Sequence, residues 1–239
     1  MGDQSADNVT FLSWNLAMIE RSAEAPPQWD VSDTEAAVRD RVLVLAPDLV
    51  LFQELPGFVP FVESHGMVRA NPRSHSGNLA TLVGLDRMVR EPVVTVVPGC
   101  ALLTTLAEPA LTVANVHLAP GPGAIGERLE QVAAVVAASP TEALLIVGDT
   151  NTRRAEIGAI EAAGLVTAKP PRPTWDSRRN RFRPGPEYSA YFTRWFASPA
   201  VTVSRIKVWH QPLRHDRYQF HLSDHYALSG TVTLRERAG

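Results

Sequence analysis

Short runs of apolar residues recur along the chain, and Pro, Gly or polar residues interrupt them. These runs are rich in Val, Leu and Thr, which is typical of β-strands. The expected strands cover residues 9–14, 48–54, 79–85, 93–97, 101–106, 111–118, 144–149 and 227–234. The pattern therefore predicts a chain that is rich in short strands.

Two segments have the spacing of amphipathic helices instead. In residues 33–46, apolar side chains recur at i, i+4 and i+7, and Ser32 with Glu35 fits an S-x-x-E capping box. Residues 124–138 carry a similar apolar stripe, and the Pro at position 140 stops the helix. The sequence thus predicts two helices among the strands.

These elements follow one another in a repeated order. A strand ends at Asn15, a helix follows, and the next strand ends at Glu54. Later, a strand ends at His117, a helix follows, and the next strand ends at Asp149. Two such β-α-β halves predict an α/β fold of two packed sheets related by a pseudo-twofold axis. The polar strand ends are then expected to meet at one rim.

The length and composition agree with one folded unit. With 239 residues, 45% hydrophobic and 20% charged, the chain resembles an ordinary globular protein. We expect a single domain over 1–239, with a core of about 9–235, because the repeated halves leave no room for a linker. The single cysteine excludes an internal disulfide and a Cys-based zinc site.

Charge and targeting signals restrict the partners. The formal net charge of -2 predicts no general attraction for nucleic acid, so any site for a polyanion must be local. The start MGDQSADN lacks the apolar segment of a signal peptide, and no apolar run approaches the roughly 18 residues that span a bilayer. We expect a cytoplasmic protein with no membrane partner, and a monomer rather than an oligomer.

Each polar strand end has an ordinary structural interpretation when it is taken alone. Asp149 and Asn151 suit a turn or a helix N-cap, and His117 suits a buried core histidine. The pair Asp224-His225 could belong to an ordinary loop. Glu54 is the exception, because it follows an almost continuous apolar run, where a carboxylate lies at a rim or is buried at high cost.

Taken together, the strand ends favour a different interpretation. Hydrolysis of a phosphodiester needs a metal with oxygen ligands, groups that align an attacking water, and donors for the phosphate oxygens. Carboxylates, an amide and imidazoles provide these groups, and this sequence places them all at strand ends. The sequence therefore predicts a hydrolytic centre at the rim.

The motifs at these positions resemble a known family. SWNL, LFQE, VHL, GDTN and SDH, in this order, are similar to the five signature blocks of the endonuclease/exonuclease/phosphatase superfamily. The resemblance spans residues 11–234. It implies a four-layered α/β/β/α sandwich and one Mg²⁺ or Mn²⁺ at the rim. Among the branches, GDTNTRRAE, HLAPGPGAIGERLEQ and TWDSRRN are most similar to the 5′-tyrosyl-DNA phosphodiesterases.

The resemblance implies a role for each motif residue. Glu54 would be the chief metal carboxylate, with Asn15 and Asp224 nearby in metal and phosphate binding.

The catalytic roles fall on four other residues. Asp149 would align or deprotonate the attacking water, with Asn151 beside it. His117 and His225 would stabilise the transition state. Whether Asp149 or His225 is the general base stays open at this stage.

A long irregular stretch, 166–187, is expected to bind substrate. Thr174 and Trp175 would shape the substrate wall. The loop that follows contains Arg178, Arg179, Arg181 and Arg183 among prolines, with aromatic residues between them. Such loops are most often simply solvated, but arginines interleaved with aromatic residues beside a phosphate site suit stacking on bases and pairing with phosphates.

One position departs from the branch. Its members usually carry an Asp that orients the final catalytic histidine, and Thr193 stands there in this chain. A threonine cannot supply that negative charge, so another acid, such as Asp176 or Glu187, would have to orient His225.

Three functions are compatible with these features. The favoured one is a divalent-metal-dependent hydrolase that cleaves phosphodiester bonds in nucleic acid or in a 5′-phosphotyrosyl-DNA adduct, which would place it in DNA repair. The second is a phosphatase or phosphodiesterase of a small phosphorylated metabolite, which the net charge of -2 favours. The third is a catalytically weak relative that acts as a binding module, for which Thr193 is the hint.

Overall fold

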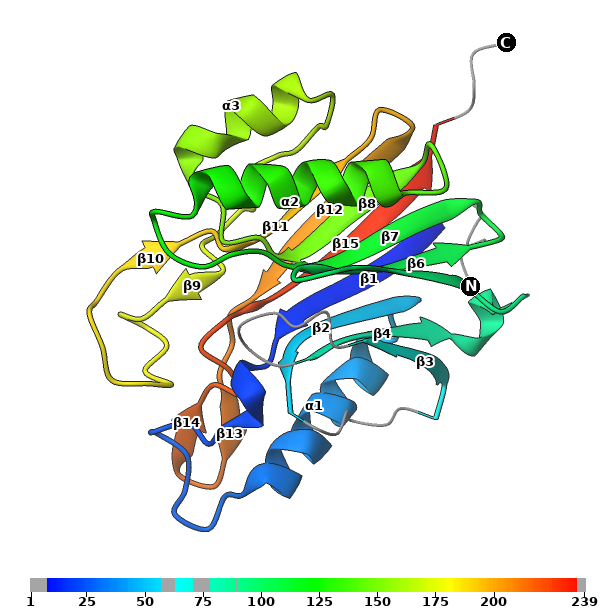
Figure 1. Cartoon of the computed structure of the whole chain (residues 1–239). Helices are drawn as coiled ribbons and strands as arrows, with labels where there is room; N and C mark the ends of the chain where they lie inside the picture. The colour runs from blue at the N-terminus through cyan, green and yellow to red at the C-terminus, as the bar shows by residue number, and fades with distance from the viewer. Residues whose placement is uncertain (1–7, 57–62, 71–77, 89, 236–239) are drawn as a thin grey trace.

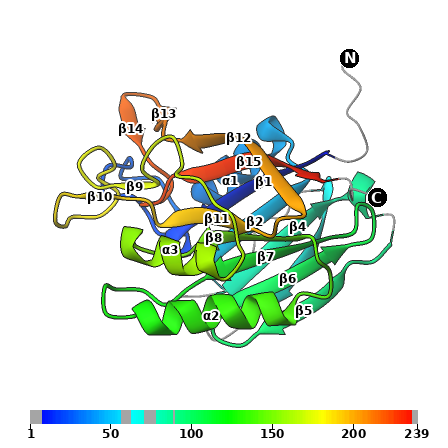
Figure 2. The same cartoon turned by 90° about the horizontal axis from the view of Figure 1, so that it is seen from above.

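Two β-sheets pack face to face in the computed structural model of the chain, and helices cover both outer sides (Figure 1, Figure 2). The structure describes residues 8–56, 63–70, 78–88 and 90–235. The first seven residues of the polar N-terminal segment lie outside the described residues. The α/β fold expected from the repeated halves is therefore confirmed.

The first sheet has six strands in the order β12-β15-β1-β2-β4-β3, and only β1 and β2 are parallel. Its strands are β1 (Asn8–Asn15), β2 (Leu49–Leu55), β3 (His65–Ala70), β4 (Asn78–Gly84), β12 (Val201–Trp209) and β15 (Ala227–Leu234).

The second sheet has five strands in the order β11-β8-β7-β6-β5, and only β7 and β8 are parallel. Its strands are β5 (Val93–Val97), β6 (Ala101–Leu106), β7 (Leu111–His117), β8 (Leu144–Asp149) and β11 (Thr193–Ala197). Two small hairpins add β9 (Trp175–Asp176) with β10 (Ser189–Ala190), and β13 (Leu213–His215) with β14 (Tyr218–Phe220).

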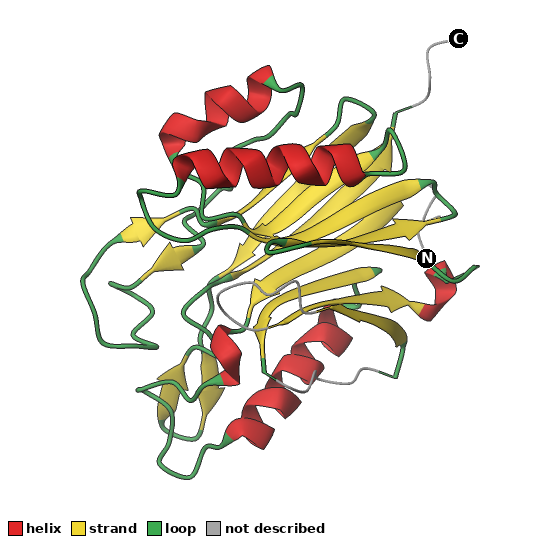
Figure 3. Cartoon of the chain, viewed as in Figure 1, coloured by secondary structure: helices red, strands yellow, loops and turns green. Residues whose placement is uncertain are grey.

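Helices form the two outer layers, as the colours of Figure 3 make clear. Helices α2 (Ile125–Ala138) and α3 (Arg154–Ala162) cover the second sheet, and α1 (Val31–Leu45) covers the first (Figure 1). Two 3₁₀ turns, η1 (Ala17–Ile19) and η2 (Leu85–Arg87), complete the described helices. None of these helices is both long and apolar enough to cross a membrane. The order helix, sheet, sheet, helix is the four-layered sandwich expected from the motifs.

The two predicted β-α-β halves are the parallel pairs at the centre of each sheet. Helix α1 joins the parallel strands β1 and β2, and α2 joins the parallel strands β7 and β8. Parallel neighbours need such a crossover connection. Because both strands of a parallel pair end at the same edge, each half brings two strand ends together.

Burial on both faces explains why the strands are almost continuously apolar. In β1, Val9 and Phe11 face the core between the sheets, whereas Leu12 and Trp14 face α1. Successive side chains of a strand point to opposite faces, so a strand in an inner layer needs apolar residues at nearly every position.

The structure corrects the predicted start of the first helix. Helix α1 begins at Val31, and Asp30 caps it by accepting a hydrogen bond from the backbone N–H of Asp33. The proposed cap Ser32 instead lies inside the helix and donates its hydroxyl hydrogen to Asp30. An aspartate at position 30 provides the same acceptor earlier in the chain.

A buried contact between the two sheets lies directly beneath the rim. Asn115 of β7 points across the interface, and its Nδ2 donates to the carbonyl oxygens of Phe52 (3.0 Å) and Ala80 (2.9 Å) in the other sheet. Gln53 Nε2 donates to Asn115 Oδ1 at 2.7 Å. Both amide side chains are fully buried. This bridge fixes the ends of β2 and β7 relative to each other.

We expect Asn115→Leu, which keeps the volume but removes the amide, to lower the free energy of unfolding by roughly 2–5 kcal/mol. The reason is that buried carbonyl groups lose their donor, at a cost of about 1–3 kcal/mol each. Thr104→Val is the matched control, because the buried Thr104 hydroxyl has no hydrogen-bond partner among the described residues. Urea unfolding should show little change or a small gain for that control. Equal stability of Asn115→Leu and the parent would contradict the bridge.

Candidate active site

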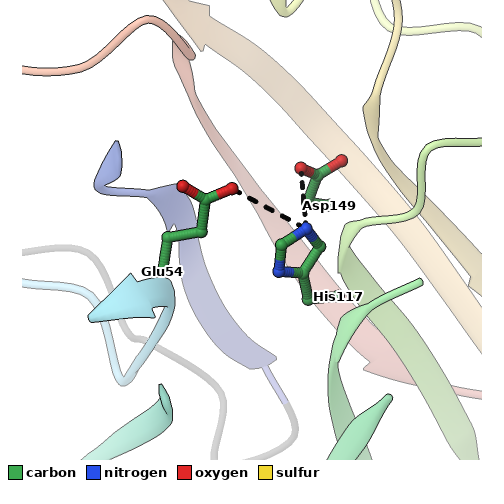
Figure 4. A group of neighbouring side chains, drawn as sticks. All are labelled: Glu54, His117 and Asp149. Atoms are coloured by element: carbon green, nitrogen blue, oxygen red, sulfur yellow. Dashed lines mark ion pairs between the residues drawn. The ribbon is translucent and has the colours of Figure 1, made fainter. Parts of the chain in front are cut away.

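Four polar strand ends meet where the two sheets adjoin. Asn15 closes β1, Glu54 lies near the end of β2, His117 closes β7 and Asp149 closes β8. Figure 4 shows the side chains of Glu54, His117 and Asp149 turned toward one another. One atom from each of these three lies within 4.8 Å of the others. The structure thus brings together the residues that the sequence placed at strand ends.

A β-bulge directs Glu54 toward this rim. Phe52 pairs with Ala80 and Leu55 pairs with Asn78, so three steps along β2 match two along β4. The extra residue gives Glu54 a positive φ of 52°, which is uncommon for a residue with a side chain. Asn115 donates to the carbonyl groups of Phe52 and Ala80, the last pair before the register shifts. The buried bridge therefore holds the bulge that orients Glu54.

A glycine lets Asp149 approach β7. The backbone of Gly148 has a φ of +153°, and a Cβ there would collide with the carbonyl oxygen of Val116. Asp149 pairs in register with His117 on β7 and with Thr193 on β11. Neighbouring residues of a sheet direct their side chains to the same face. The catalytic carboxylate expected at position 149 is thus flanked by His117 and Thr193.

Asp149 Oδ2 is the centre of the polar contacts. Asn15 Nδ2 donates to it at 3.0 Å and to Glu54 Oε1 at 2.9 Å. The Nε2 atoms of His117 and His225 both lie 3.6 Å from the same oxygen. His117 Nε2 also lies 3.8 Å from Glu54 Oε1. One amide and two imidazoles therefore surround two neighbouring carboxylates.

These residues fit a divalent cation. Glu54 and Asp149 offer carboxylate oxygens, the ligands preferred by hard cations such as Mg²⁺. Among the described residues, no Lys or Arg forms an ion pair with either carboxylate. Two close carboxylates repel each other unless a cation or a proton compensates them. The side chain of Glu54 is 17% exposed, so a cation can reach it from the rim.

The loop carrying Asp224 and His225 is tied to the end of β1. Ser223 Oγ donates to the carbonyl oxygen of Asn15 at 2.6 Å and accepts from the backbone N–H of His225 at 3.1 Å. This brings His225 to Asp149. Asp224 lies outside the three-residue group, and its Oδ2 is 3.4 Å from Arg183 Nη1. Its part in metal binding stays a proposal.

Asn151 supports the same rim from the loop after β8. Its Nδ2 donates to the carbonyl oxygen of Leu118 at 3.1 Å, and its backbone N–H donates to Asp149 Oδ1 at 3.3 Å. Helix α3 is capped at Arg153, so neither Asp149 nor Asn151 is its N-cap. The ordinary helix-cap interpretation of these two residues is therefore wrong.

An aromatic wall borders the cluster. The rings of Trp175 and His225 meet edge to face, with centroids 4.9 Å apart, and Trp175 stacks on Tyr188 at 6.0 Å. Thr174 is fully buried and its Oγ1 accepts from the backbone N–H of Thr193 at 2.9 Å. Thr174 thus holds the wall together from behind, while Trp175 faces the histidine.

The arginine-rich loop lies beyond this wall. Arg178, Arg179 and Arg181 are exposed, and none of them makes an ion pair or hydrogen bond with the strand-end residues described above. Arg183 instead contacts Glu20 at 2.8 Å as well as Asp224. Binding of substrate by the first three arginines stays a proposal.

Two polar atoms of the described residues lack hydrogen bonds around position 193, where Thr replaces the Asp expected from the resemblance. His225 Nδ1 is buried with no hydrogen-bond partner among the described residues, and so is Thr193 Oγ1. Neither Asp176 nor Glu187 bonds to the ring of His225. Among the described residues, no carboxylate therefore accepts from Nδ1 of His225, which is the role that an aspartate at position 193 would have.

Sequence patterns missed several residues that shape this site. Asn115 and Gln53 interrupt otherwise apolar strands, and that interruption was a usable signal. Phe192 and Tyr188 gave no such signal, because their place beside Trp175 depends on the β9–β10 hairpin.

Comparison with solved structures places the fold. TDP2 from D. rerio in complex with single-strand DNA product superposes with a TM-score of 0.72 at 21% identity, covering 95% of this chain and 99% of that chain. TDP2 from C. elegans gives a TM-score of 0.72 at 19% identity, covering 97% and 77%. The endonuclease/exonuclease/phosphatase from Beutenbergia cavernae gives 0.63 at 16% identity, covering 95% and 72%.

These similarities define the fold of the chain as that of the endonuclease/exonuclease/phosphatase proteins. TDP2 structures share it over nearly the whole chain, in agreement with the branch that the sequence motifs resemble. No protein-family model matches the sequence, and no match to a curated protein was found.

We expect Asp149→Ala and His225→Ala each to lower turnover by on the order of 10²-fold or more, because both residues would act mainly in the transition state. Both variants should stay folded, since these rim side chains contribute little to the core. Circular dichroism and steady-state kinetics measure the two effects separately. If Asp149→Ala unfolds the protein while refolded material keeps the turnover rate of the parent, Asp149 only stabilises the turn after β8 and has no catalytic role.

We expect Thr193→Asp to raise turnover near neutral pH by on the order of tenfold. A carboxylate there can accept a hydrogen bond from His225, and a bond to a charged group contributes about 1.5–3 kcal/mol, part of which is offset by desolvation. Thr193→Asn is the control of similar size without charge, and it should bring no comparable gain. Equal rates for both variants and the parent would show that the site needs no acid at this position.

Proposed function

We propose that this chain is a divalent-metal-dependent phosphodiesterase whose active site is the rim cluster. The observation that carries this proposal is the position of Asp149 Oδ2, which lies within 3.6 Å of Asn15 Nδ2 and of the Nε2 atoms of His117 and His225. A carboxylate, an amide and two imidazoles at one point provide groups that align a water molecule and donors for the phosphate oxygens, both of which phosphodiester hydrolysis needs.

In the proposed site, Glu54 would hold Mg²⁺ or Mn²⁺, and Asn15 and Asp224 would complete the metal and phosphate site. The bound cation would offset negative charge on the phosphate and on the leaving oxygen. Asn15 adjoins this position, because its Nδ2 donates to the carboxylates of both Glu54 and Asp149. Its Oδ1, the atom that would bind a cation, accepts from the backbone N–H of Ala17 at 2.9 Å.

The remaining residues act on the attacking water and on the phosphate. Water attacks phosphorus, and its proton passes to Asp149 or to His225, which lie next to each other. Asn151 keeps the Asp149 carboxylate in place through its backbone N–H. His117 and His225 donate to the phosphate oxygens as negative charge develops, and the bond to the leaving oxygen breaks.

A nucleic-acid strand is the proposed substrate, including one with a 5′-phosphotyrosyl adduct. Trp175, with Thr174 behind it, would form a surface on which a base stacks, and the exposed side chains of Arg178, Arg179 and Arg181 would meet backbone phosphates. The structurally similar D. rerio TDP2 is known in complex with a single-strand DNA product, which supports this choice.

A cleavage screen separates this substrate from the alternatives. It compares 5′-phosphotyrosyl DNA, abasic DNA, RNA and sugar phosphates, each with Mg²⁺ or Mn²⁺. Cleavage of sugar phosphates alone would identify a metabolite enzyme, and no cleavage of any substrate would favour a binding module.

Removal of the metal provides the first test of the reaction. We expect hydrolysis of bis-p-nitrophenyl phosphate to stop in EDTA and to return with Mg²⁺ or Mn²⁺. Glu54→Gln keeps the size of the side chain but removes the charge that a hard cation needs, so turnover should fall by on the order of 10²-fold or more. The isosteric control Glu130→Gln, on the exposed side of α2, should behave as the parent. Full activity of Glu54→Gln would exclude the proposed metal role.

The loop arginines provide the test of the substrate. We expect Arg178→Gln combined with Arg179→Gln and Arg181→Gln to weaken the binding of short single-stranded DNA. The salt dependence of binding should also become shallower, since each lost phosphate contact reduces the slope of log K against log salt by roughly 0.7 for a single strand. An unchanged affinity and slope would favour the small phosphorylated metabolite as the substrate.

A further inference from the structure

A cleft beside α3 fits a part of the substrate that lies away from the bond to be hydrolysed. A cleft of about 820 Å³ lies between α3, residues 167–169 and the segment around β10 and β11. It begins at Thr152, the residue that follows Asn151, and includes Ala190, the partner of Trp175 in the β9–β10 hairpin. Two residues of its lining thus neighbour the site, one along the chain from Asn151 and the other across the hairpin from Trp175.

The charge of this cleft is predominantly positive. Of the described residues, four with cationic side chains line it (Arg153, Arg154, Lys169 and Arg194), whereas Glu161 is the one with a carboxylate. The whole chain carries a formal charge of -2, so this concentration of positive charge is local. A cleft lined by one sign of charge raises the local concentration of ligands of the opposite sign.

Arg194 is the most informative of these cations. Its side chain is only 8% exposed, and no ion pair joins it to a carboxylate among the described residues. Its Nε donates to the carbonyl oxygen of Tyr191 at 2.8 Å, and burial lowers the pKa of the Arg194 guanidinium below its usual range. One edge of the guanidinium is thus fixed, while its remaining N–H groups lack a carboxylate.

Arg128 shows what a purely structural arginine looks like in the same region. It is fully buried, and its Nε and Nη2 form a bidentate pair with Glu156 at 2.7 and 2.8 Å. A buried guanidinium without such a partner is costly, because its charge has been taken out of water. The desolvated charge of Arg194 has no such partner in the described part of the chain, and its side chain faces the cleft, where a bound anion would compensate the charge.

The other cations complete the arrangement around one tyrosine. Lys169 Nζ lies 4.6 Å from the centroid of the Tyr191 ring, and the guanidinium carbon of Arg194 lies 5.4 Å from it. Arg154 is exposed on the first turn of α3, on the other wall of the cleft. Planar guanidinium groups suit bidentate binding of phosphate, and an ammonium adds a point charge.

We propose that this cleft is a binding site for a second phosphate group of the substrate, away from the bond to be hydrolysed, with Arg194, Arg154 and Lys169 as its ligands. The assignment rests on the proposed phosphodiesterase function of the neighbouring rim. The phosphate belongs to the backbone of a nucleic-acid strand or to a small molecule with two phosphates. Both sources present anionic phosphate oxygens to the three cations.

The test is a binding measurement on the full chain in EDTA, which prevents cleavage. Hexathymidylate with a 3′ fluorophore is titrated by fluorescence anisotropy, and fructose 1,6-bisphosphate is titrated by calorimetry. The variants are Arg154→Gln/Lys169→Gln, whose two side chains are exposed, and Arg194→Gln alone. The matched control is Arg39→Gln/Arg217→Gln, which removes the same charge from exposed positions on α1 and the β13–β14 turn.

We expect the cleft double variant to raise the Kd for hexathymidylate by about tenfold or more, and to reduce the salt slope by roughly 0.7 for the one phosphate that the cleft no longer neutralises. The control should change the Kd by no more than about twofold, since salt screens distant exposed charges. Loss of affinity for the bisphosphate alone would also support the subsite, with a small molecule as the source.

Unchanged affinity of Arg154→Gln/Lys169→Gln for both probes would overturn the subsite, and so would an equal loss in the control. Binding by Arg194→Gln is interpreted only if urea unfolding shows that this variant is folded. The variant Arg154→Gln/Lys169→Gln tests the subsite without it. Hydrolysis of bis-p-nitrophenyl phosphate by the parent is measured separately. Its absence would refute the proposed reaction, whereas the binding data would still decide on the cleft.

Discussion

Asn115 reaches from one sheet to the other and donates both amide hydrogens to carbonyl groups of the pair at which β2 and β4 lose their register. This contact supports the bulge that gives Glu54 its positive φ and directs its carboxylate to the rim. Gln53 closes the bridge from its own strand. The bridge thus ties the two halves of the site, one in each sheet, to each other directly beneath the carboxylates.

The sequence predicted the framework of this site for a physical reason. Strands in inner layers need apolar residues on both faces, so β1, β2, β7 and β8 appear in the sequence as almost continuous apolar runs. Their polar ends are therefore conspicuous, and the β-α-β order predicts that they meet. Asn15, Glu54, His117 and Asp149 were identified in this way, and the structure brings them together.

Several other strands and one helix gave weaker patterns in the sequence and were not predicted. Strand β12 mixes exposed polar residues with apolar ones and contains a register shift between Ser204 and Lys207, so its pattern is irregular. Strands β3 and β11 and the short helix α3 were missed as well, and α3 contains Gly158, a poor helix former. The cleft could not be predicted, because Arg154 and Arg194 lie far apart in the sequence and line the same cleft only through packing.

The central claim is that the rim holds one divalent cation through Glu54. Diffraction data collected at the manganese absorption edge from crystals grown with Mn²⁺ would locate the cation directly. The account predicts one anomalous peak within roughly 2.5 Å of a carboxylate oxygen of Glu54, between β2 and β8. A peak at another surface, or no peak at the rim at saturating Mn²⁺, would contradict it.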